Sequence, residues 1–161
     1  MSYQPTQPIY RFGSSAGDTL RKQNDMLTDI WCELDGLFPS VYQFYNSENN
    51  TAVATNNRQY VYSNVAEAVR IADMVPSICN SKARPLVMVY TWHLYHSGLQ
   101  YCCDQDEEMT WIQSFAAGAD ALVMWGYAPD SSSATNFSHW YLSDFAPMVN
   151  NWHPPQGPHY S

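Results

Sequence analysis

Three short apolar segments, separated by stretches with helical periodicity, constrain this chain more than any other feature. They span residues 37–42, 86–92 and 121–126, and an aromatic residue stands at or near the end of each. Strands that alternate with helices form a parallel sheet through right-handed crossovers, which is the α/β class. A complete eight-stranded α/β barrel needs roughly 250 residues, and this chain has 161. The sequence therefore predicts either a small three-layer α/β domain or a portion of a larger barrel.

The rest of the chain divides into helices, loops and two polar ends. The predicted helices, read from apolar residues at helical spacing, cover residues 18–34, 59–75, 104–117 and 136–149. The predicted strands cover residues 38–45, 86–92 and 121–125. A polar, Asn-rich loop is expected over 46–58. Residues 1–16 predict a flexible lead and 153–161 a Pro-rich tail, so we expect one folded unit over 17–152.

Local signals mark several element ends. Gly36 is a candidate left-handed cap after the first helix, and Pro76 and Pro85 bracket a turn region before the second strand. Asp104 and Glu107 have the spacing of a capping box. The other acids are expected on solvated helix faces or near helix N-termini; they include Asp29, Glu33, Asp35, Glu67, Asp73, Asp106 and Glu108.

Composition argues against several partners and sites. The formal net charge is −8 and the 7 Lys and Arg residues are scattered, whereas nucleic-acid binding requires clustered basic residues. No apolar run is long enough to span a bilayer, and residues 1–17 lack the pattern of a signal peptide. The four cysteines, which fit no zinc pattern or disulfide framework, are Cys32, Cys79, Cys102 and Cys103. We predict no metal site, although His93 and His96 precede the last two cysteines, and no cofactor.

The candidate site is an aromatic rim. Ligand sites of parallel sheets lie at the carboxyl ends of the strands, which places Tyr42, Trp92 and Trp125 on one rim. Gly126 lets the chain turn away and leaves the indole of Trp125 at that rim. Aromatic rings with a polar tip suit the face of a sugar. A glycosidase also needs a carboxylic acid, often paired with a second carboxylate, and no such pair ends an apolar strand here, so no catalytic residue is predicted.

Four segments, taken in order, resemble the hyaluronidase family. Residues 37–42, which read Leu-Phe-Pro-Ser-Val-Tyr, look like a strand of that family, and residues 67–72, which read Glu-Ala-Val-Arg-Ile-Ala, look like the helix that follows it. Residues 86–91 are similar to the family's next strand. Residues 116–126, which end in Trp-Gly, resemble a later strand with its preceding helix end.

The resemblance implies a fold, a reaction and a setting. The fold would be the C-terminal portion of a distorted TIM-like (β/α) barrel, with parallel strands alternating with helices. The reaction would be endo-hydrolysis of β-1,4 N-acetylhexosaminide bonds in hyaluronan or chondroitin. In that family the substrate's acetamido oxygen attacks the anomeric carbon, a glutamic acid protonates the leaving oxygen, and an aspartate orients the acetamido group. The setting would be secreted or lysosomal.

The resemblance also assigns residues. It implies that Tyr42 hydrogen-bonds the acetamido group, that Trp125 walls its pocket, and that Tyr90 and Trp92 belong to the same substrate-binding set. The family's Asp-x-Glu pair lies on an early strand that this chain does not contain, so the chain alone is expected to be inactive. Trp92 stands where several members carry Arg. The implied partners are a glycosaminoglycan or other amino-sugar polysaccharide and the missing N-terminal half of the barrel.

Two alternatives stay open. The chain could be a non-catalytic remnant that binds amino sugars or serves only as structure. It could also belong to a different α/β-barrel glycosidase, such as one that acts on chitin.

Overall fold

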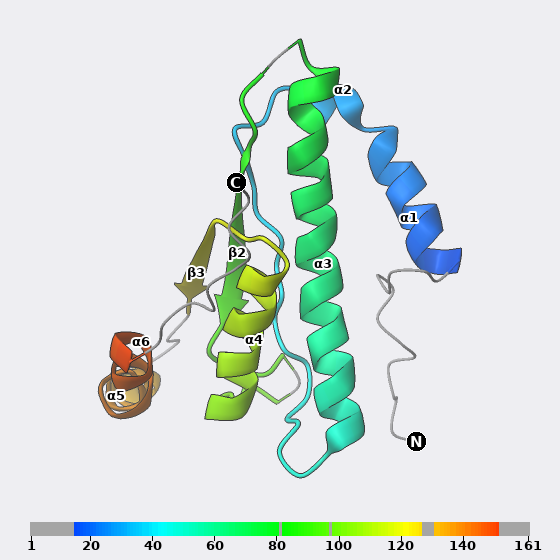
Figure 1. Cartoon of the computed structure of the whole chain (residues 1–161). Coiled ribbons are helices and arrows are strands. Elements are labelled where there is room, and N and C mark those ends of the chain that lie inside the picture. The colour runs from blue at the N-terminus through cyan, green and yellow to red at the C-terminus, as the bar shows by residue number, and fades with distance from the viewer. Residues whose placement is uncertain (1–14, 81, 97, 127–130, 152–161) are drawn as a thin grey trace.

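A three-stranded parallel sheet with helices packed against it forms the body of the protein (Figure 1). The computed structural model describes residues 15–80, 82–96, 98–126 and 131–151. The helices, with the π-helical turn η1, are α1 (Ser15–Asp25), α2 (Thr28–Trp31), α3 (Thr51–Ile78), α4 (Asp104–Ala116), α5 (Ser131–Trp140), η1 (Tyr141–Phe145) and α6 (Ala146–Asn151). The expected α/β class is confirmed. None of the described helices is long and apolar enough to cross a membrane.

The structure tests the expected boundaries of the lead and the tail only in part. Residues 1–14 and 152–161 lie outside the described part of the chain, and with them nearly all of the expected lead and the whole of the expected tail. Ser15 and Ala16, which we expected in the lead, instead form the start of α1.

The sheet has the order β1-β2-β3, with β1 (Gly36–Leu37), β2 (Leu86–Trp92) and β3 (Ala121–Trp125). The second and third predicted strands are confirmed. The predicted strand over 38–45 is wrong, because pairing beyond Leu37 is limited to a single bridge between Ser40 and Tyr90. Pro39 has no N–H to donate to the ladder, although its carbonyl accepts from Tyr90 N at 2.9 Å. Gly36 lies in β1 rather than in a left-handed cap.

Helix α3 is longer at both ends than the sequence predicts. Its N-cap is Asn50, whose side chain accepts a 3.2 Å hydrogen bond from Val53 N, and this bond satisfies one of the donors left free in the first turn. Most of the expected loop over 46–58 is therefore helical. Pro76 lies inside the last turn rather than in a turn region after the helix.

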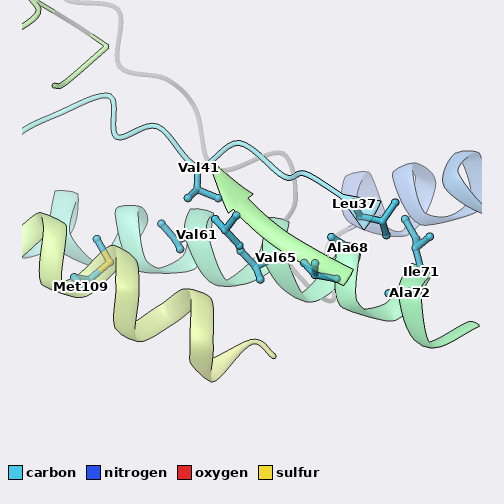
Figure 2. Close-up of a cluster of buried hydrophobic side chains, with 10 residues drawn as sticks. Leu37, Val41, Val61, Val65, Ala68, Ile71, Ala72 and Met109 are labelled. Atoms are coloured by element: carbon cyan, nitrogen blue, oxygen red, sulfur yellow. The ribbon is translucent and has the colours of Figure 1, made fainter. Parts of the chain in front are cut away.

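The hydrophobic core lies between the sheet and α3, with one side chain from α4 (Figure 2). Burial alternates along β2, where Val87 and Val89 are fully buried against the helices and the neighbouring positions point to the other face. The buried members are Leu37, Val41, Val61, Val65, Ala68, Ile71, Ala72, Val87, Val89 and Met109. On the opposite face Leu86 and Phe38 are each 52% exposed, so this apolar face is open among the described residues.

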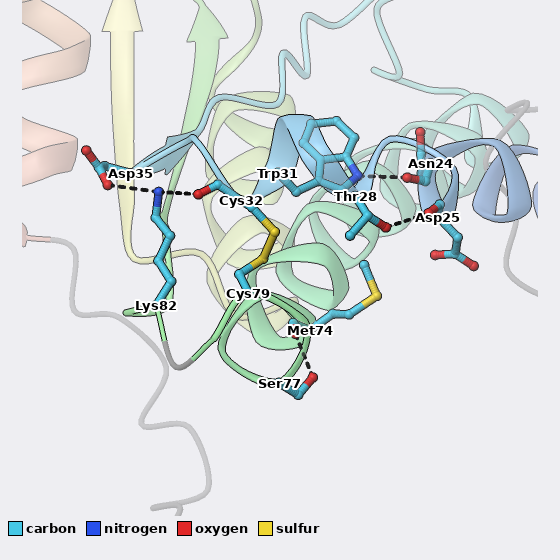
Figure 3. Close-up of a disulfide and its surroundings, with 10 residues drawn as sticks. All are labelled: Asn24, Asp25, Thr28, Trp31, Cys32, Asp35, Met74, Ser77, Cys79 and Lys82. Carbon is cyan, nitrogen blue, oxygen red and sulfur yellow. Dashed lines mark hydrogen bonds and ion pairs between the residues drawn. A yellow bond between two sulfur atoms is a disulfide. The ribbon is translucent and has the colours of Figure 1, made fainter.

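A disulfide fixes the first helices to the end of α3 (Figure 3). Cys32 is bonded to Cys79 across a Cα–Cα distance of 5.5 Å, within the usual range for a bridge. The cysteine spacing matched no disulfide framework and left the pairing open, because a separation of 47 positions gives no spacing motif to recognise. The predicted helix over 18–34 is also wrong as a single element, since it breaks after Asp25 and α2 follows as a single turn. Trp31 Nε1 donates to Asn24 O at 2.7 Å across that break.

Helix α4 begins after Cys103, and no side chain caps it. The predicted capping box between Asp104 and Glu107 is therefore wrong, and the side chain of Glu107 is buried instead. The last predicted helix, over 136–149, falls within the run of α5, η1 and α6. This run packs on α4 through an edge-to-face contact between Trp111 and Phe145, whose ring centroids are 5.5 Å apart.

Candidate functional site: an aromatic rim at the carboxyl ends of the strands

The three aromatic residues expected at the strand ends meet in one cluster, which we call the aromatic rim and define as Tyr42, Trp92 and Trp125. The two indoles are stacked, with centroids 5.8 Å apart and an interplanar angle of 11°. The ring of Tyr42 lies 6.1 Å from Trp92 and 5.8 Å from Trp125. Trp125 Nε1 donates a 2.6 Å hydrogen bond to the hydroxyl of Tyr42, so the rings have defined relative positions.

The register of the sheet brings these rings together. Trp92 pairs with Trp125 at the last position of β2 and β3, and paired residues of parallel strands point to the same face. The bridge between Ser40 and Tyr90 carries the first chain segment alongside β2. Tyr42, two residues after Ser40, thereby reaches the level of Trp92. Trp125 remains 41% exposed, which leaves part of the indole open to a ligand.

Tyr90 lies beside the aromatic rim on the same face of the sheet. It is two positions before Trp92 on β2 and is partly buried. Its ring makes an edge-to-face contact with Phe38 at 5.9 Å. The structure therefore places all four expected binding residues on the open face, with Tyr42, Trp92 and Trp125 in mutual contact and Tyr90 one step further from the strand ends.

Gly126 has a packing role that the sequence did not indicate. A Cβ atom at this position would lie 2.4 Å from Cε1 of His93, which is closer than non-bonded atoms approach. The glycine thus makes room for the His93 ring. That ring is 2% exposed and contacts Phe137, Tyr101 and Trp140, with centroid distances of 4.9, 5.6 and 5.1 Å. Burial lowers the pKa of His93 below its ordinary value.

Three acids that we expected on solvated surfaces are buried, and the first of them is Asp106. Asp106 has no exposed surface, and its carboxylate accepts from Ser47 N at 2.9 Å, from Ser47 Oγ, and from the hydroxyl of Tyr95 at 2.7 Å. The Tyr95 hydroxyl in turn accepts from Cys103 N at 3.0 Å. Burial raises the pKa of Tyr95 above its ordinary value. Asp106 therefore joins the loops after β1 and β2 to the start of α4.

A second polar contact reinforces this connection. Gln43, which follows Tyr42 directly, donates from Nε2 to Thr110 Oγ1 on α4 at 2.8 Å. The Gln43 carbonyl accepts from His96 N at 2.8 Å. The sequence shows only a run of acids at the start of this helix. It does not distinguish the acid that is buried and hydrogen-bonded from the acids that are solvated.

Glu107 and Glu67 are also buried, contrary to our expectation of solvated faces. Glu67 accepts from Asn24 and from Arg70, each at 2.8 Å. Glu107 is 4% exposed and its Oε1 has no hydrogen-bond partner among the described residues. Burial, helped by the negative charges of Asp104 and Asp144, raises the pKa of Glu107 to about 8. A carboxyl group in these surroundings is protonated at neutral pH.

No acid with the geometry of a catalytic pair lies at the aromatic rim in the part of the chain that the structure describes. Asp106 and Glu108 have the Asp-x-Glu spacing, but they lie on α4, where residues two apart point in different directions. The Asp106 carboxylate is buried and already accepts hydrogen bonds from Ser47 and Tyr95 of the two loops, and Glu108 is exposed. Among the described residues, no group of three or more His, Cys, Asp or Glu side chains could hold a metal ion.

Comparisons with known proteins bear on both the fold and the site. A family model described as hyaluronidase matches residues 3–149. Hyaluronidase-2 of Ovis aries is 36% identical over 111 residues, which cover 69% of this chain and 22% of the sheep protein. Hyaluronidase PH-20 of Homo sapiens is 32% identical over 106 residues, which cover 65% of this chain and 19% of the human protein.

Solved structures agree with the sequence comparisons. Bee venom hyaluronidase in complex with a hyaluronic acid tetramer superposes with a TM-score of 0.72 at 25% identity, covering 83% of this chain and 40% of that chain. A monoclinic crystal structure of the bee venom enzyme gives a TM-score of 0.71. The expected partial TIM-like barrel is confirmed, and the chain spans less than half the length of these proteins.

Proposed function

The chain belongs to the hyaluronidase family. On that premise we propose that its aromatic rim forms one wall of the pocket that binds the substrate's acetamido group in a glycoside hydrolase, which we call the acetamido-binding wall. The reaction proposed for the whole barrel is hydrolysis of β-1,4 N-acetylhexosaminide bonds in hyaluronan or chondroitin by the substrate-assisted route. The proton donor of that route belongs to an Asp-x-Glu strand that is absent from this sequence. We therefore propose that the chain alone binds amino sugars without cleaving them.

The observation that carries the proposal is the hydrogen bond between Trp125 and Tyr42. The Tyr42 hydroxyl accepts from Trp125 Nε1 at 2.6 Å and has no acceptor of its own among the described residues. Its O–H is thus available to donate to a carbonyl oxygen. An acetamido group that lies against the indole of Trp125 would place its methyl on an apolar face and its carbonyl oxygen near the Tyr42 proton.

In the substrate-assisted reaction, the acetamido oxygen must approach the anomeric carbon of its own sugar ring. A rigid wall that holds the acetamido group reduces the entropy lost in reaching that geometry. The stacked indoles and the Tyr42 hydroxyl are fixed to three neighbouring segments of the sheet. This supports a positioning role for Tyr42 and Trp125, with Trp92 supporting the indole and Tyr90 extending the surface.

The alternative is a non-catalytic protein that binds amino sugars. It is favoured by the lack of a carboxylate in hydrogen-bonding contact with the aromatic rim among the described residues. Both proposals require the same acetamido-binding surface, and they differ only in whether a catalytic acid from elsewhere in the barrel joins it. An acid would come from the remaining part of a barrel, and the open apolar face that carries Phe38 and Leu86 is the surface that we propose this part covers.

An oxidising compartment is proposed as the setting. The disulfide between Cys32 and Cys79 is of the kind that persists in secreted and lumenal proteins. Two glycosylation sequons begin at Asn49 and Asn136, and both side chains are exposed. These observations support the secreted or lysosomal setting that the family resemblance implies.

Two assays test the proposal. Purified chain incubated with hyaluronan is expected to release no reducing ends, and sustained release would contradict the assignment of the acid to a missing strand. Calorimetric titration with an N-acetylglucosamine tetramer is expected to show binding that Trp125→Ala abolishes. Tyr62→Ala is the matched control, because Tyr62 and Trp125 are both 41% exposed and Tyr62 lies on α3, away from the aromatic rim.

A further inference from the structure

We propose that the sugar-binding surface continues past the aromatic rim into a second sugar subsite, formed by the rings of Phe44 and His96. This inference rests on the proposed function and deepens it: the second subsite takes a hexuronic acid, and the imidazole of His96 donates to its carboxylate. In hyaluronan and chondroitin, each N-acetylhexosamine has a hexuronic acid as its neighbour. A glycan whose amino sugar lies against Trp125 therefore presents a carboxylate one sugar further along.

A continuous row of rings joins the rim to the second subsite. Trp92 stacks on Trp125 at 5.8 Å and also makes an edge-to-face contact with His96, whose ring centroid lies 6.4 Å away. The His96 ring in turn lies 5.0 Å from that of Phe44. Phe44 is 42% exposed and His96 is also exposed, so both rings have surface open to a ligand. A sugar next to the rim can pack its C–H face on Phe44 while its polar groups meet the imidazole.

The segment that carries Phe44 places its ring on the same surface as Tyr42. Along residues 41–44, Val41 and Gln43 are buried, whereas Tyr42 is half-buried and Phe44 is exposed. This alternation is typical of an extended segment, whose successive side chains point to opposite sides. Phe44 therefore follows Tyr42 on the open side, one step further along the chain.

The backbone that carries His96 is held in place. His96 N donates to Gln43 O at 2.8 Å, which joins it to the segment that carries Phe44. The preceding residue, Tyr95, is 1% exposed, and its hydroxyl donates to Asp106 at 2.7 Å. The imidazole is thus exposed on a fixed backbone, so little conformational entropy is lost when it meets a ligand.

Few positive groups lie at this end of the molecule. Helix α3 runs antiparallel to β2 (Figure 1), so its first half lies near the strand ends and carries exposed Arg58. Lys82 and Arg84 lie before β2, at the opposite end of the sheet, and are paired with acids. Among the described Lys, Arg and His side chains, His96 is the one that is both exposed and in ring contact with Trp92.

The acids at this end make the recognition of a carboxylate local. Exposed Glu48 lies in the loop after Phe44, and exposed Asp104 and Glu108 lie at the start of α4. With a net charge of −8 on the whole chain, these acids oppose a long-range attraction of an anionic glycan. Binding of the hexuronic acid therefore requires a direct contact, and a charge-assisted hydrogen bond from an imidazolium supplies one.

Other titrating groups can be told apart from His96. Those on the elements packed around it, together with the fixed charge of Arg58, are Glu48, His93, Asp104, Asp106, Glu107 and Glu108. His93 is 2% exposed, and burial lowers its pKa. His139 lies on α5, on a different side of that helix from Phe137 and Trp140, which contact His93. A pH effect on carboxylate binding that disappears when His96 is replaced is therefore due to His96.

The test titrates the unmodified chain with a hyaluronan tetramer and, separately, with a β-1,4-linked N-acetylglucosamine tetramer. Calorimetry is carried out at about pH 5.5 and about pH 7.5, because histidine is the side chain type that changes charge across this range. We expect the hyaluronan tetramer to bind about fivefold more tightly at the lower pH, since an imidazolium then donates to its carboxylate. The affinity of the neutral tetramer is expected to be the same at both pH values.

Three variants assign the effect to one side chain. His96→Gln removes the charge and keeps a hydrogen-bonding group, so hyaluronan affinity is expected to lose its pH dependence and stay at the weaker value. His96→Arg is charged at both pH values and is expected to bind tightly at both. Arg58→Gln is the matched control, because it removes a positive charge at the same end of the molecule but outside the row of rings. It is expected to keep the full pH dependence.

The outcomes separate this inference from the proposed function. Hyaluronan affinity that does not change with pH, or a pH dependence that survives in His96→Gln, would overturn the second subsite. The acetamido-binding wall would still stand if the neutral tetramer binds and Trp125→Ala abolishes that binding. Binding of neither tetramer would overturn both. If a His96 variant does not fold, as judged by circular dichroism, the comparison of the two tetramers on the unmodified chain still tests the second subsite.

Discussion

The indole nitrogen of Trp125 donates a 2.6 Å hydrogen bond to the hydroxyl of Tyr42, which joins two residues 83 positions apart in the sequence. This bond connects the segment after β1 to the end of β3, with Trp92 of β2 in contact with both rings. It uses the hydroxyl as an acceptor and so leaves the hydroxyl proton for a ligand. The site is therefore a property of the assembled sheet rather than of any one segment.

Tyr42→Phe tests this relationship directly. The phenylalanine ring can keep the contacts with Trp92 and Trp125, but it cannot accept from the indole or donate to an acetamido oxygen. We expect binding of an N-acetylglucosamine tetramer to weaken by about tenfold, equivalent to one hydrogen bond of about 1.4 kcal/mol. The free energy of unfolding is expected to change little. Unchanged affinity, measured by calorimetry, would remove Tyr42 from the binding wall.

Asp106→Asn is expected to destabilise the protein by roughly 2–3 kcal/mol, because buried hydrogen bonds to a charged group are stronger than neutral ones. The amide cannot accept at both oxygen positions from Ser47 and Tyr95. Asp104→Asn is the matched control, since Asp104 is on the same helix and exposed. Urea denaturation measures both variants. Equal stability of the two would show that the buried carboxylate does not hold the loops.

Loss of the disulfide is expected to lower the free energy of unfolding substantially. Cys32 and Cys79 are separated by 47 positions, and a loop of this size gives about 4 kcal/mol in the chain-entropy model. Cys32→Ser and the double variant with Cys79→Ser are expected to be destabilised equally, because either change removes the same bond. Chemical denaturation of the oxidised proteins provides the comparison. A single variant as stable as the unmodified chain would show that the bridge contributes nothing.

Gly126→Ala is expected to lower the free energy of unfolding by roughly 1–3 kcal/mol through overpacking. The added methyl would lie 2.4 Å from the ring of His93. The double variant with His93→Ala removes that ring and provides the test of cause in a double-mutant cycle. The cost of the alanine at position 126 should disappear in the His93→Ala background. An equal cost in both backgrounds would mean that the backbone, rather than the His93 ring, requires glycine.

Glu107 predicts a dependence of stability on pH. Its pKa is raised to about 8 from the ordinary 4.5, so the folded protein holds a proton that the unfolded chain releases above about pH 4.5. The stabilisation of the folded protein by this bound proton is fully present below about pH 4.5, and it is lost as the pH rises through about 8. Burial of neutral His93 acts in the opposite direction, because its lowered pKa costs stability as the pH falls.

Glu107→Gln isolates the first effect. The glutamine keeps the shape of the protonated acid and does not titrate, so the decline in melting temperature between pH 5 and about pH 8 should be smaller than in the unmodified chain. Thermal denaturation at several pH values measures this slope. Identical slopes in the two proteins would show that Glu107 does not titrate in this range.

The sequence predicted what depends on local patterns. The runs 86–92 and 121–125 are apolar and short, and both are strands with the expected bounds. Tyr42, Trp92 and Trp125 were expected on one rim from strand direction alone, and the structure brings them into contact. These predictions succeeded because a buried parallel strand imposes its own composition and because its carboxyl end has a fixed place in the sheet.

The rest depends on tertiary contacts that local patterns do not encode. Pro39 looked compatible with a longer strand, but its missing N–H ends the regular pairing. Asp106 and Glu107 looked like solvated residues at a helix start and became buried because two loops cover that start. The pairing of Cys32 with Cys79 follows from the packing of α2 beside the end of α3 and has no counterpart in cysteine spacing.

The most direct test of the account observes the indole N–H groups by two-dimensional NMR during a titration. The chain has six tryptophans, and the Trp125 signal is assigned by its absence in Trp125→Phe. An N-acetylglucosamine tetramer is expected to shift the Trp125 signal, whereas a β-1,4 glucose tetramer, which lacks the acetamido group, is not. The Trp31 signal, from an indole bonded to Asn24 O, should stay fixed. A Trp125 signal that both tetramers shift equally, or that neither shifts, would contradict acetamido recognition at the aromatic rim.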